Sequence, residues 1–199
     1  MVVLASASPR RAQLLQQIGI QFTKQSADID ESAKPDESAR ELVDRLARAK
    51  AVAVANLRKD HLLVLGSDTI GLLNEQILVK PKNFADFHRI MKTLSGNTHS
   101  VLTAIAIANY CETENEVQVI SKLVESKVTF KVLSAEEIEA YWRTGEPQDK
   151  AGGYAIQGYA GQFVTKIEGS YSAIVGLPLY ETSELLKKVS QDQQKGFAQ

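Results

Sequence analysis

One apolar run with a charge inside it constrains the fold of this chain most. Residues 62–73 are almost wholly apolar, except for Gly66, Ser67, Asp68 and Thr69. A run of this kind is typical of a central strand that is covered on both faces of its sheet. An unpaired carboxylate there is costly, so we expect Asp68 to be paired, metal-bound or catalytic. The run therefore predicts a central strand that is interrupted by a polar segment, residues 66–69, which we call the polar knuckle and which we expect to serve a function.

Helical and strand patterns alternate along the rest of the chain. Residues 1–5 and 20–24 read as short strands on either side of a helix, with Ser8 as its N-cap and Pro9 at its first position. Strands joined by helices predict an α/β fold, and a hairpin in the middle of the chain makes the sheet mixed. We expect further helices over residues 35–57, 83–94, 135–143 and 178–189, and hairpin strands over residues 98–109 and 117–133.

Length and composition set the outer limits. The 199 residues and the 44% hydrophobic content predict one domain over residues 1–189, with the Gln-rich residues 190–199 as a flexible tail. The net charge of −1 gives no bulk attraction to nucleic acid or membrane, so we expect neither as a partner. No run reaches the roughly 18 apolar residues of a membrane span, and no basic leader precedes Ser8, which predicts a cytoplasmic protein. The single Cys111 excludes an internal disulfide.

Cations recur near the ends of the predicted elements. Arginine forks suit phosphate oxygens, and the N-terminus of the first helix adds backbone N–H groups and a positive dipole end. Together these groups could hold a polyphosphate. Taken singly, each cation is more simply a solvated surface charge. The cations are Arg10, Arg11, Lys50, Lys80 and Lys150.

Carboxylates supply the counterpart to these cations. Asp28, Asp30 and Glu31 form an acidic loop that could face Asp68 across a cleft. A magnesium ion binds one or two such carboxylates together with phosphate oxygens and waters. The alternative for the loop is a solvated turn.

Several familiar sites have no counterpart in the sequence. The phosphate-binding P-loop pattern, the dinucleotide glycine pattern, a His-Glu-x-x-His pair and a Gly-x-Ser-x-Gly elbow are all missing. The three isolated histidines, His61, His88 and His99, are expected to be structural or on the surface.

Seven motifs, in order, resemble one known family, the Maf-like nucleoside triphosphate pyrophosphatases. The resemblance runs from Leu4 to about Leu186 and implies an α/β fold with an elongated mixed sheet, flanking helices and two lobes around a cleft, related to the inosine triphosphate pyrophosphatases. It also implies a metal-dependent hydrolase (Mg²⁺ or Mn²⁺) that is cytoplasmic and forms a homodimer. The motifs are residues 4–11, 66–69, 80–81, 94–99 with Thr103, 145–147, 149–154 and 156–158.

Three positions resemble the branch of this family that hydrolyses dTTP and UTP to the monophosphate and pyrophosphate: Arg10, Thr69 and Gln157. The resemblance implies removal of excess or non-standard nucleotides and a link to arrest of cell division. The amide of Gln157 offers a donor and an acceptor to a pyrimidine edge. The implied site has Asp68 as general base or metal ligand and Glu31 as a second metal ligand, with Ser8, Arg10, Arg11, Lys50, Thr69, Lys80 and Gln157 on the substrate.

Two other readings compete with this one. A non-catalytic nucleotide-binding regulator of septum formation would use the same pocket, but binding alone would not need a carboxylate beside the phosphates. A redox protein that uses NAD is disfavoured by the missing glycine pattern. Asp68 together with the cations therefore favours an enzyme.

Overall fold

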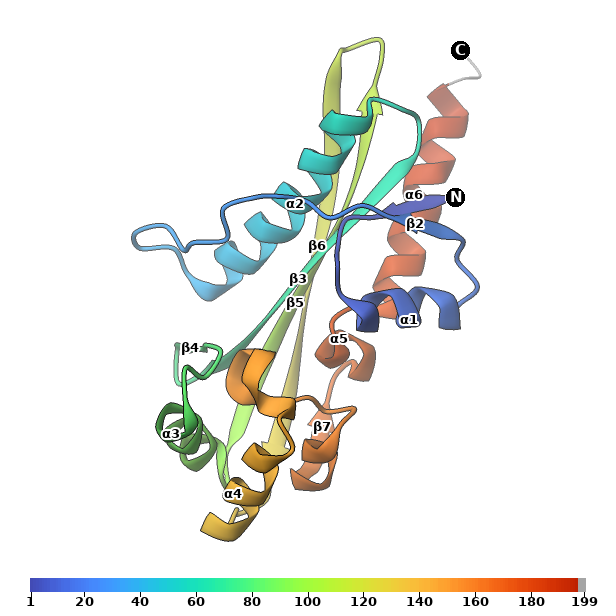
Figure 1. The fold of residues 1–199 in the computed structure, drawn as a ribbon. Coiled ribbons are helices and arrows are strands. Elements are labelled where there is room, and N and C mark those ends of the chain that lie inside the picture. The colour runs from blue at the N-terminus through green and yellow to red at the C-terminus, as the bar shows by residue number, and fades with distance from the viewer. Residues whose placement is uncertain (197–199) are drawn as a thin grey trace. The chain divides into compact units, whose positions relative to one another are not determined.

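The computed structural model describes residues 1–196, apart from the side chains of Asp149 and residues 192–196. Its strands form one seven-stranded sheet in the order β2-β1-β3-β5-β6-β7, with β4 paired to β3 (Figure 1). β1 runs parallel to β2 and β3, whereas the β3–β4 and β6–β7 pairs are antiparallel, so the expected mixed α/β fold is confirmed. The strands are β1 Val2–Leu4, β2 Phe22–Lys24, β3 Leu63–Leu73, β4 Gln76–Leu78, β5 Thr98–Cys111, β6 Glu116–Phe130 and β7 Val164–Glu168.

The helices carry the caps that their sequences predict. Ser8 caps α1 with Pro9 at its start, and Ser134 forms a capping box with Glu137 on α4. A second capping box, Ser38 with Glu41, starts α2 four residues later than expected. The helices are α1 Pro9–Gln17, α2 Ala39–Arg58, α3 Phe84–Leu94, α4 Ala135–Arg143, α5 Tyr171–Val175 and α6 Leu179–Gly196, with 3-10 turns η1 Glu146–Asp149, η2 Ala151–Gly153 and η3 Tyr159–Phe163.

The chain divides into two compact units. The first unit comprises residues 1–68, 103–124 and 176–199, and the second comprises residues 69–102 and 125–175. The division falls inside β3, between Asp68 and Thr69, so the polar knuckle is shared between the units in sequence.

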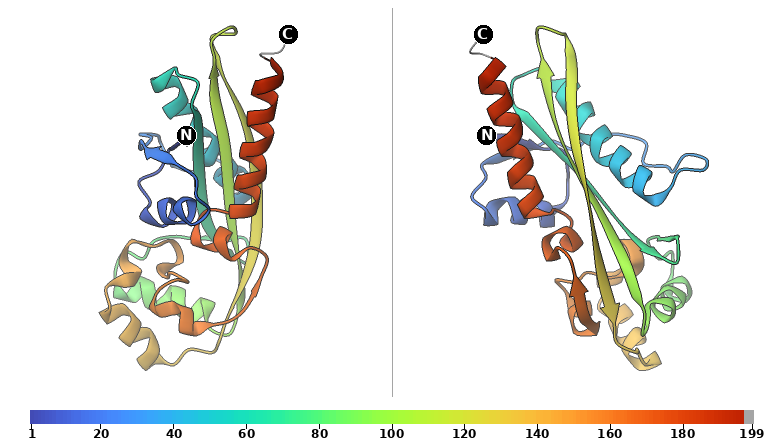
Figure 2. Two further views of the ribbon diagram at one scale, coloured as in Figure 1. Left: turned by 90° about the vertical axis from the view of Figure 1, so that its right-hand side faces the viewer. Right: turned by 180° about the vertical axis from the view of Figure 1, so that it is seen from behind.

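The first unit is built from two parallel crossovers. α1 connects β1 to β2, and α2 connects β2 to β3, which pairs with β1 on its other side. α2 and α6 lie on opposite faces of the strands of this unit (Figure 2). β3 and its neighbour β5 are therefore covered, which agrees with the burial of residues 63–68 and 103–108.

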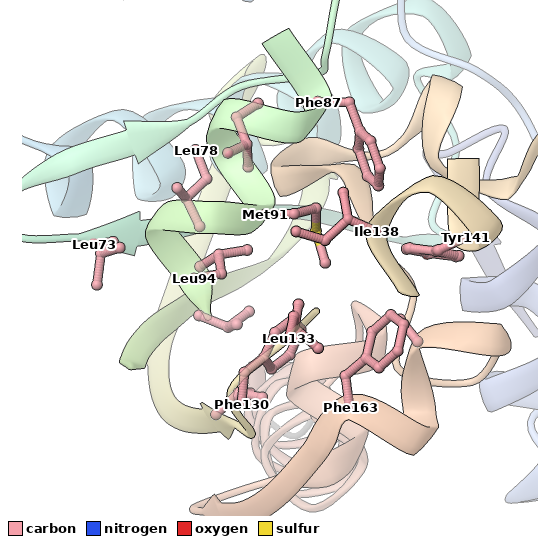
Figure 3. Packing of buried hydrophobic residues seen from close by; sticks show 14 of the residues in the cluster. Leu73, Leu78, Phe87, Met91, Leu94, Phe130, Leu133, Ile138, Tyr141 and Phe163 are labelled. Atoms are coloured by element: carbon pink, nitrogen blue, oxygen red, sulfur yellow. The ribbon is translucent and has the colours of Figure 1, made fainter. Parts of the chain in front are cut away.

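The second unit has its own hydrophobic core. Side chains from β3, β4, α3, β5, β6, α4 and η3 form one cluster that includes Phe87, Met91, Phe130, Tyr141 and Phe163, each at most 2% exposed (Figure 3). The aromatic rings of this cluster meet edge to face or tilted, as in the pair Phe87 and Tyr141, whose ring centroids are 5.8 Å apart. This core supports the glycine-rich segment 145–163.

The structure departs from the sequence expectations in three places. β3 is continuous through residues 63–73 instead of breaking at the knuckle. Residues 76–78 form a strand that the sequence pattern did not predict, because they pair with residues 71–73 across the turn at Asn74 and Glu75. The last helix continues to Gly196 instead of ending at Val189, and residues 197–199 of the expected tail lie outside the described part. No helix among residues 1–196 is long and apolar enough to cross a bilayer.

Candidate active site

The first turn of α1 carries two arginines at the N-terminus of the helix. Ser8 has extended backbone angles, and its hydroxyl accepts a hydrogen bond from the Arg11 N–H at 3.5 Å. Pro9 at the first helical position is pre-organised for the helix and has no N–H to satisfy. The loop therefore ends in a helix N-terminus, which favours anions, with Arg10 and Arg11 in its first turn.

Arg11 is held in place by groups from three separate segments. Its Nε donates to the carbonyl of Gly176 at 2.9 Å, and its Nη1 donates to Ser6 Oγ at 3.1 Å. The buried Ser67 hydroxyl donates to the same Gly176 carbonyl at 3.0 Å. These contacts fix the direction of the guanidinium, which is a charged donor that suits carboxylate and phosphate oxygens.

The electrostatic surroundings of Arg11 connect it to the rest of the cluster. Burial lowers the pKa of the Arg11 guanidinium, and the neighbouring charge of Arg10 lowers it further. The negative charges of Asp68 and Glu31 act in the opposite direction. An arginine stays protonated under such shifts, so Arg11 provides a fixed positive charge next to two carboxylates.

Lys50 lies between those two carboxylates. Its ammonium is 2.7 Å from Asp68 Oδ1 and 2.7 Å from Glu31 Oε1. The side chains of Lys50 and Asp68 are only 11% and 12% exposed, whereas that of Glu31 is 60% exposed. The Lys50–Asp68 pair is thus nearly desolvated, and removal of Lys50 would leave the Asp68 carboxylate buried without its ion-pair partner.

A glycine permits α2 to approach β3 closely enough for this pair. A Cβ at Gly66 would lie 2.3 Å from the Ala47 carbonyl oxygen and 2.8 Å from the Ala51 nitrogen, both on α2. Lys50 belongs to the buried face of α2, one residue before Ala51. Gly66 and Asp68 are two residues apart on β3, so they share one face of the strand. The glycine therefore brings helix and carboxylate together.

The first unit thus contains six of the expected site residues: Ser8, Arg10, Arg11, Glu31, Lys50 and Asp68. Thr69, Lys80 and Gln157 belong to the second unit, where Thr69 is half-buried and the other two are exposed. The sequence reasoning did not single out Ser6, Ser67 or Gly176. Ser67 had one sequence signal, which is its position beside Asp68 in an apolar strand. The main-chain carbonyl of Gly176 has no signal in the sequence, because every residue has such a carbonyl.

The residues fit a hard divalent cation only in part. Among the described residues there is no group of three or more His, Cys, Asp or Glu side chains that could hold a metal. Asp68 and Glu31 are two carboxylates that converge on one point, and magnesium commonly takes one or two carboxylates plus phosphate oxygens. The pair suits an ion that arrives with a polyphosphate better than one bound by protein alone.

These features define an α/β protein with a cation-lined, carboxylate-bearing site that suits an anionic ligand. The chain belongs to the Maf-like protein family, which matches residues 1–189. It is 55% identical over 186 residues to the dTTP/UTP pyrophosphatase of Pseudoalteromonas translucida, covering 94% of this chain and 95% of that protein. It is also 49% identical over 187 residues to the dTTP/UTP pyrophosphatase of Vibrio cholerae, covering 94% and 97%.

A solved structure gives a weaker likeness. The Ham1 protein of Staphylococcus aureus is 14% identical, with a TM-score of 0.44 over 81% of this chain and 90% of that chain.

Proposed function

We propose that this protein hydrolyses dTTP and UTP to the nucleoside monophosphate and pyrophosphate. The observation that carries the proposal is the Lys50 ammonium between Asp68 and Glu31, in the same unit as the arginine-bearing N-terminus of α1. The names of relatives about half identical over nearly the whole chain support the same activity. A pure binding protein would have no use for a carboxylate at the reacting phosphate.

The reaction is attack by water on the α-phosphorus. A bond forms between the water oxygen and the α-phosphorus, the bond from the α-phosphorus to the bridging oxygen breaks, and pyrophosphate leaves. The attacking water must lose a proton, and the phosphate charge must be neutralised. Asp68 is the group we assign to the first task, as proton acceptor or as metal ligand.

The cations serve the second task. Arg10 and Arg11 provide guanidinium forks beside the N–H groups at the start of α1, and Ser8 orients that turn. Lys50 balances the charge of Asp68 in the resting protein, and we assign it to the phosphate oxygens when a nucleotide binds. Lys80 is exposed, and the family resemblance implies that it adds a further positive charge for the substrate.

A divalent ion, Mg²⁺ or Mn²⁺, is part of the proposal. Asp68 and Glu31 would hold it together with phosphate oxygens. Bound there, the ion would polarise the phosphate and lower the pKa of a bound water.

Selectivity for pyrimidines is assigned to Thr69 and Gln157. The Gln157 side chain is exposed, and no other group of the described chain forms a hydrogen bond with its amide. It can therefore present one donor and one acceptor to the O4/N3 edge of uracil or thymine. A homodimer, a cytoplasmic location and a link to cell division remain predictions.

The test is product analysis with a nucleotide panel. We expect dTTP and UTP to yield monophosphate and pyrophosphate with Mg²⁺ or Mn²⁺, and a chelator to abolish the reaction. Diphosphate with orthophosphate would show attack at the γ-phosphorus and refute the mechanism. Nucleotide binding without turnover would support a regulator in place of an enzyme.

A further inference from the structure

The segment that carries Gln157 is tied down on both sides by one chain of hydrogen bonds. The Ala155 N–H donates to the Tyr141 hydroxyl at 3.3 Å, and that hydroxyl donates to Glu146 Oε1 at 2.7 Å. The other carboxylate oxygen, Glu146 Oε2, accepts from the Tyr159 N–H at 3.0 Å. The chain thus joins the backbone two residues before Gln157 to the backbone two residues after it.

Packing makes this chain of hydrogen bonds rigid. Tyr141 lies on α4 and is fully buried in the core of the second unit (Figure 3). Its ring stacks on Tyr159 with centroids 5.4 Å apart and planes 9° from parallel, and it meets Phe163 edge to face at 5.5 Å. Burial, together with the Glu146 carboxylate, raises the pKa of the Tyr141 phenol, so the hydroxyl stays a donor.

Gly158 allows the carboxylate to sit directly beneath the segment. A Cβ at Gly158 would lie 2.1 Å from Glu146 Oε2, so any other residue there would displace the carboxylate. The Lys150 ammonium donates to the Glu146 backbone carbonyl at 2.8 Å, which fixes the start of η1. The position of Glu146 is therefore determined from both its backbone and its side chain.

A second contact anchors the segment three residues before Gln157. The Tyr154 hydroxyl is 2.6 Å from Nε2 of His99, which is only 2% exposed. The two rings meet edge to face at 5.4 Å, and both contact Phe130. Tyr154 thus connects the segment to β5.

We propose that Tyr141 and Glu146 are positioning residues that hold Gln157 for base recognition and thereby set the preference for pyrimidines over purines. This inference rests on the proposed function. A hydrogen-bonding side chain discriminates well only when its backbone is fixed before the ligand arrives, because otherwise it adapts to the wrong base or loses binding energy to ordering. None of these hydrogen bonds involves the side-chain amide of Gln157.

The chemistry of the two residues provides matched variants. Tyr141→Phe keeps the ring but removes the hydroxyl that connects Ala155 to Glu146. Glu146→Ala removes both acceptor oxygens. Glu146→Gln retains an oxygen for the Tyr159 N–H, and the Tyr141 hydroxyl can turn to accept from the new amide. Tyr110→Phe is the control, because its hydroxyl donates to Asn115 in the first unit.

The experiment measures kcat and KM for UTP and GTP by pyrophosphate release. Tyr141→Phe and Glu146→Ala should raise KM for UTP about tenfold, with kcat changed less than twofold, which corresponds to the loss of about one hydrogen bond to a charged group. The ratio of kcat/KM for UTP over GTP should fall by the same factor. Glu146→Gln and Tyr110→Phe should stay close to wild type.

A double-mutant cycle separates positioning from general destabilisation. In a Gln157→Ala background, Tyr141→Phe should change the UTP:GTP ratio less than twofold, because the side chain that it positions is gone. An additive effect would overturn the inference, as would a loss that is equal for UTP and GTP or confined to kcat.

Two further measurements test the inference if the wild type is inactive or if the variants do not fold. If the wild type releases no pyrophosphate, the proposed function is refuted, and the same variants are compared by the Kd of α,β-methylene analogues of UTP and GTP, with the same ratios expected. If the variants do not fold, amide hydrogen exchange on the wild type decides. Unprotected Ala155 and Tyr159 amides would refute the positioning role.

Discussion

The two units place their functional side chains by different means. In the first unit, charged groups come together from segments far apart in the chain: the loop at Ser6 to Arg11, the acidic loop at Glu31, α2, β3 and the main chain at Gly176. In the second unit, Gln157 is held by partners that mostly lie within 16 residues of it. The charged cluster thus depends on contacts across the whole unit, whereas the position of the Gln157 segment depends on one local packing arrangement.

The largest effect is expected from a substitution in the charged cluster of the first unit. Asp68→Asn keeps the shape of the side chain but removes its charge, so kcat for UTP should fall on the order of a hundredfold or more. Lys50 keeps Glu31 as a partner, so the variant should fold and bind nucleotide. Asp60→Asn is the matched control, since Asp60 pairs with Arg58 and accepts from the Leu62 backbone N–H, away from the Lys50–Asp68 pair. Near-normal turnover by a folded Asp68→Asn would remove Asp68 from its role and make Glu31 the next candidate.

The second prediction concerns the core of the second unit and the pH dependence of the free energy of unfolding. Burial lowers the pKa of His99 to about 4, below its usual 6.5. Between these two pH values, His99 binds a proton in the unfolded chain but not in the folded chain. The contribution of His99 to the free energy of unfolding is therefore complete above pH 6.5 and falls as the pH drops toward 4. The loss should reach about 3 kcal/mol by pH 4.

Urea unfolding at several pH values checks this loss. His99→Gln should flatten the dependence between pH 6.5 and 4, whereas the control His61→Gln, at an exposed position of the first unit, should leave it unchanged. A pH dependence that His99→Gln does not alter would contradict the prediction.

The third prediction compares two glycines of one strand. Gly66→Ala would force a Cβ against the α2 backbone and should cost about 1–3 kcal/mol of unfolding free energy. Gly71→Ala would meet the Leu78 side chain, with its nearest atom, Cδ1, at 2.9 Å, which can move more easily. Chemical denaturation should rank Gly66→Ala as the more damaging, with activity lost along with the Lys50–Asp68 pair. Equal costs would show that α2 yields as readily as a side chain.

The smallest expected effect is common to both units. Ser38→Ala in the first unit and Ser134→Ala in the second each remove a capping box and should cost about 1 kcal/mol. The exposed Ser26 provides a control that caps no helix. Thermal melts that differ strongly between the two caps would indicate that one unit unfolds before the other.

Local signals predicted most of the elements and part of the site. The Ser8–Pro9 start of α1 and the Ser134 capping box are confirmed because caps act within four residues. The apolar setting of Asp68 predicted a partner, and Lys50 on the α2 apolar face is that partner. β4 was missed because three residues form a strand only through their pairing with β3.

The polar knuckle shows why the rest could not be predicted. Its polar residues do not interrupt β3, because Ser67 finds the Gly176 carbonyl and Asp68 finds Lys50. Neither partner is near in sequence, and a carbonyl has no side-chain signature. The contact of Glu146 with the Gln157 segment could not be predicted for the same reason, since its carboxylate accepts from the backbone N–H of Tyr159.

The carbonyl of Gly176 also bears on how the protein is made. This carbonyl accepts hydrogen bonds from both Arg11 and Ser67. The φ of Gly176 is +125°, a backbone conformation that favours glycine. A chain growing from its N-terminus exposes Arg11 at the outset, but its acceptor emerges only after nearly nine-tenths of the 199 residues have been joined. Arg11 therefore gains this contact late in synthesis, and a fragment that stops short of Gly176 would carry Arg11 without the carbonyl that orients its guanidinium.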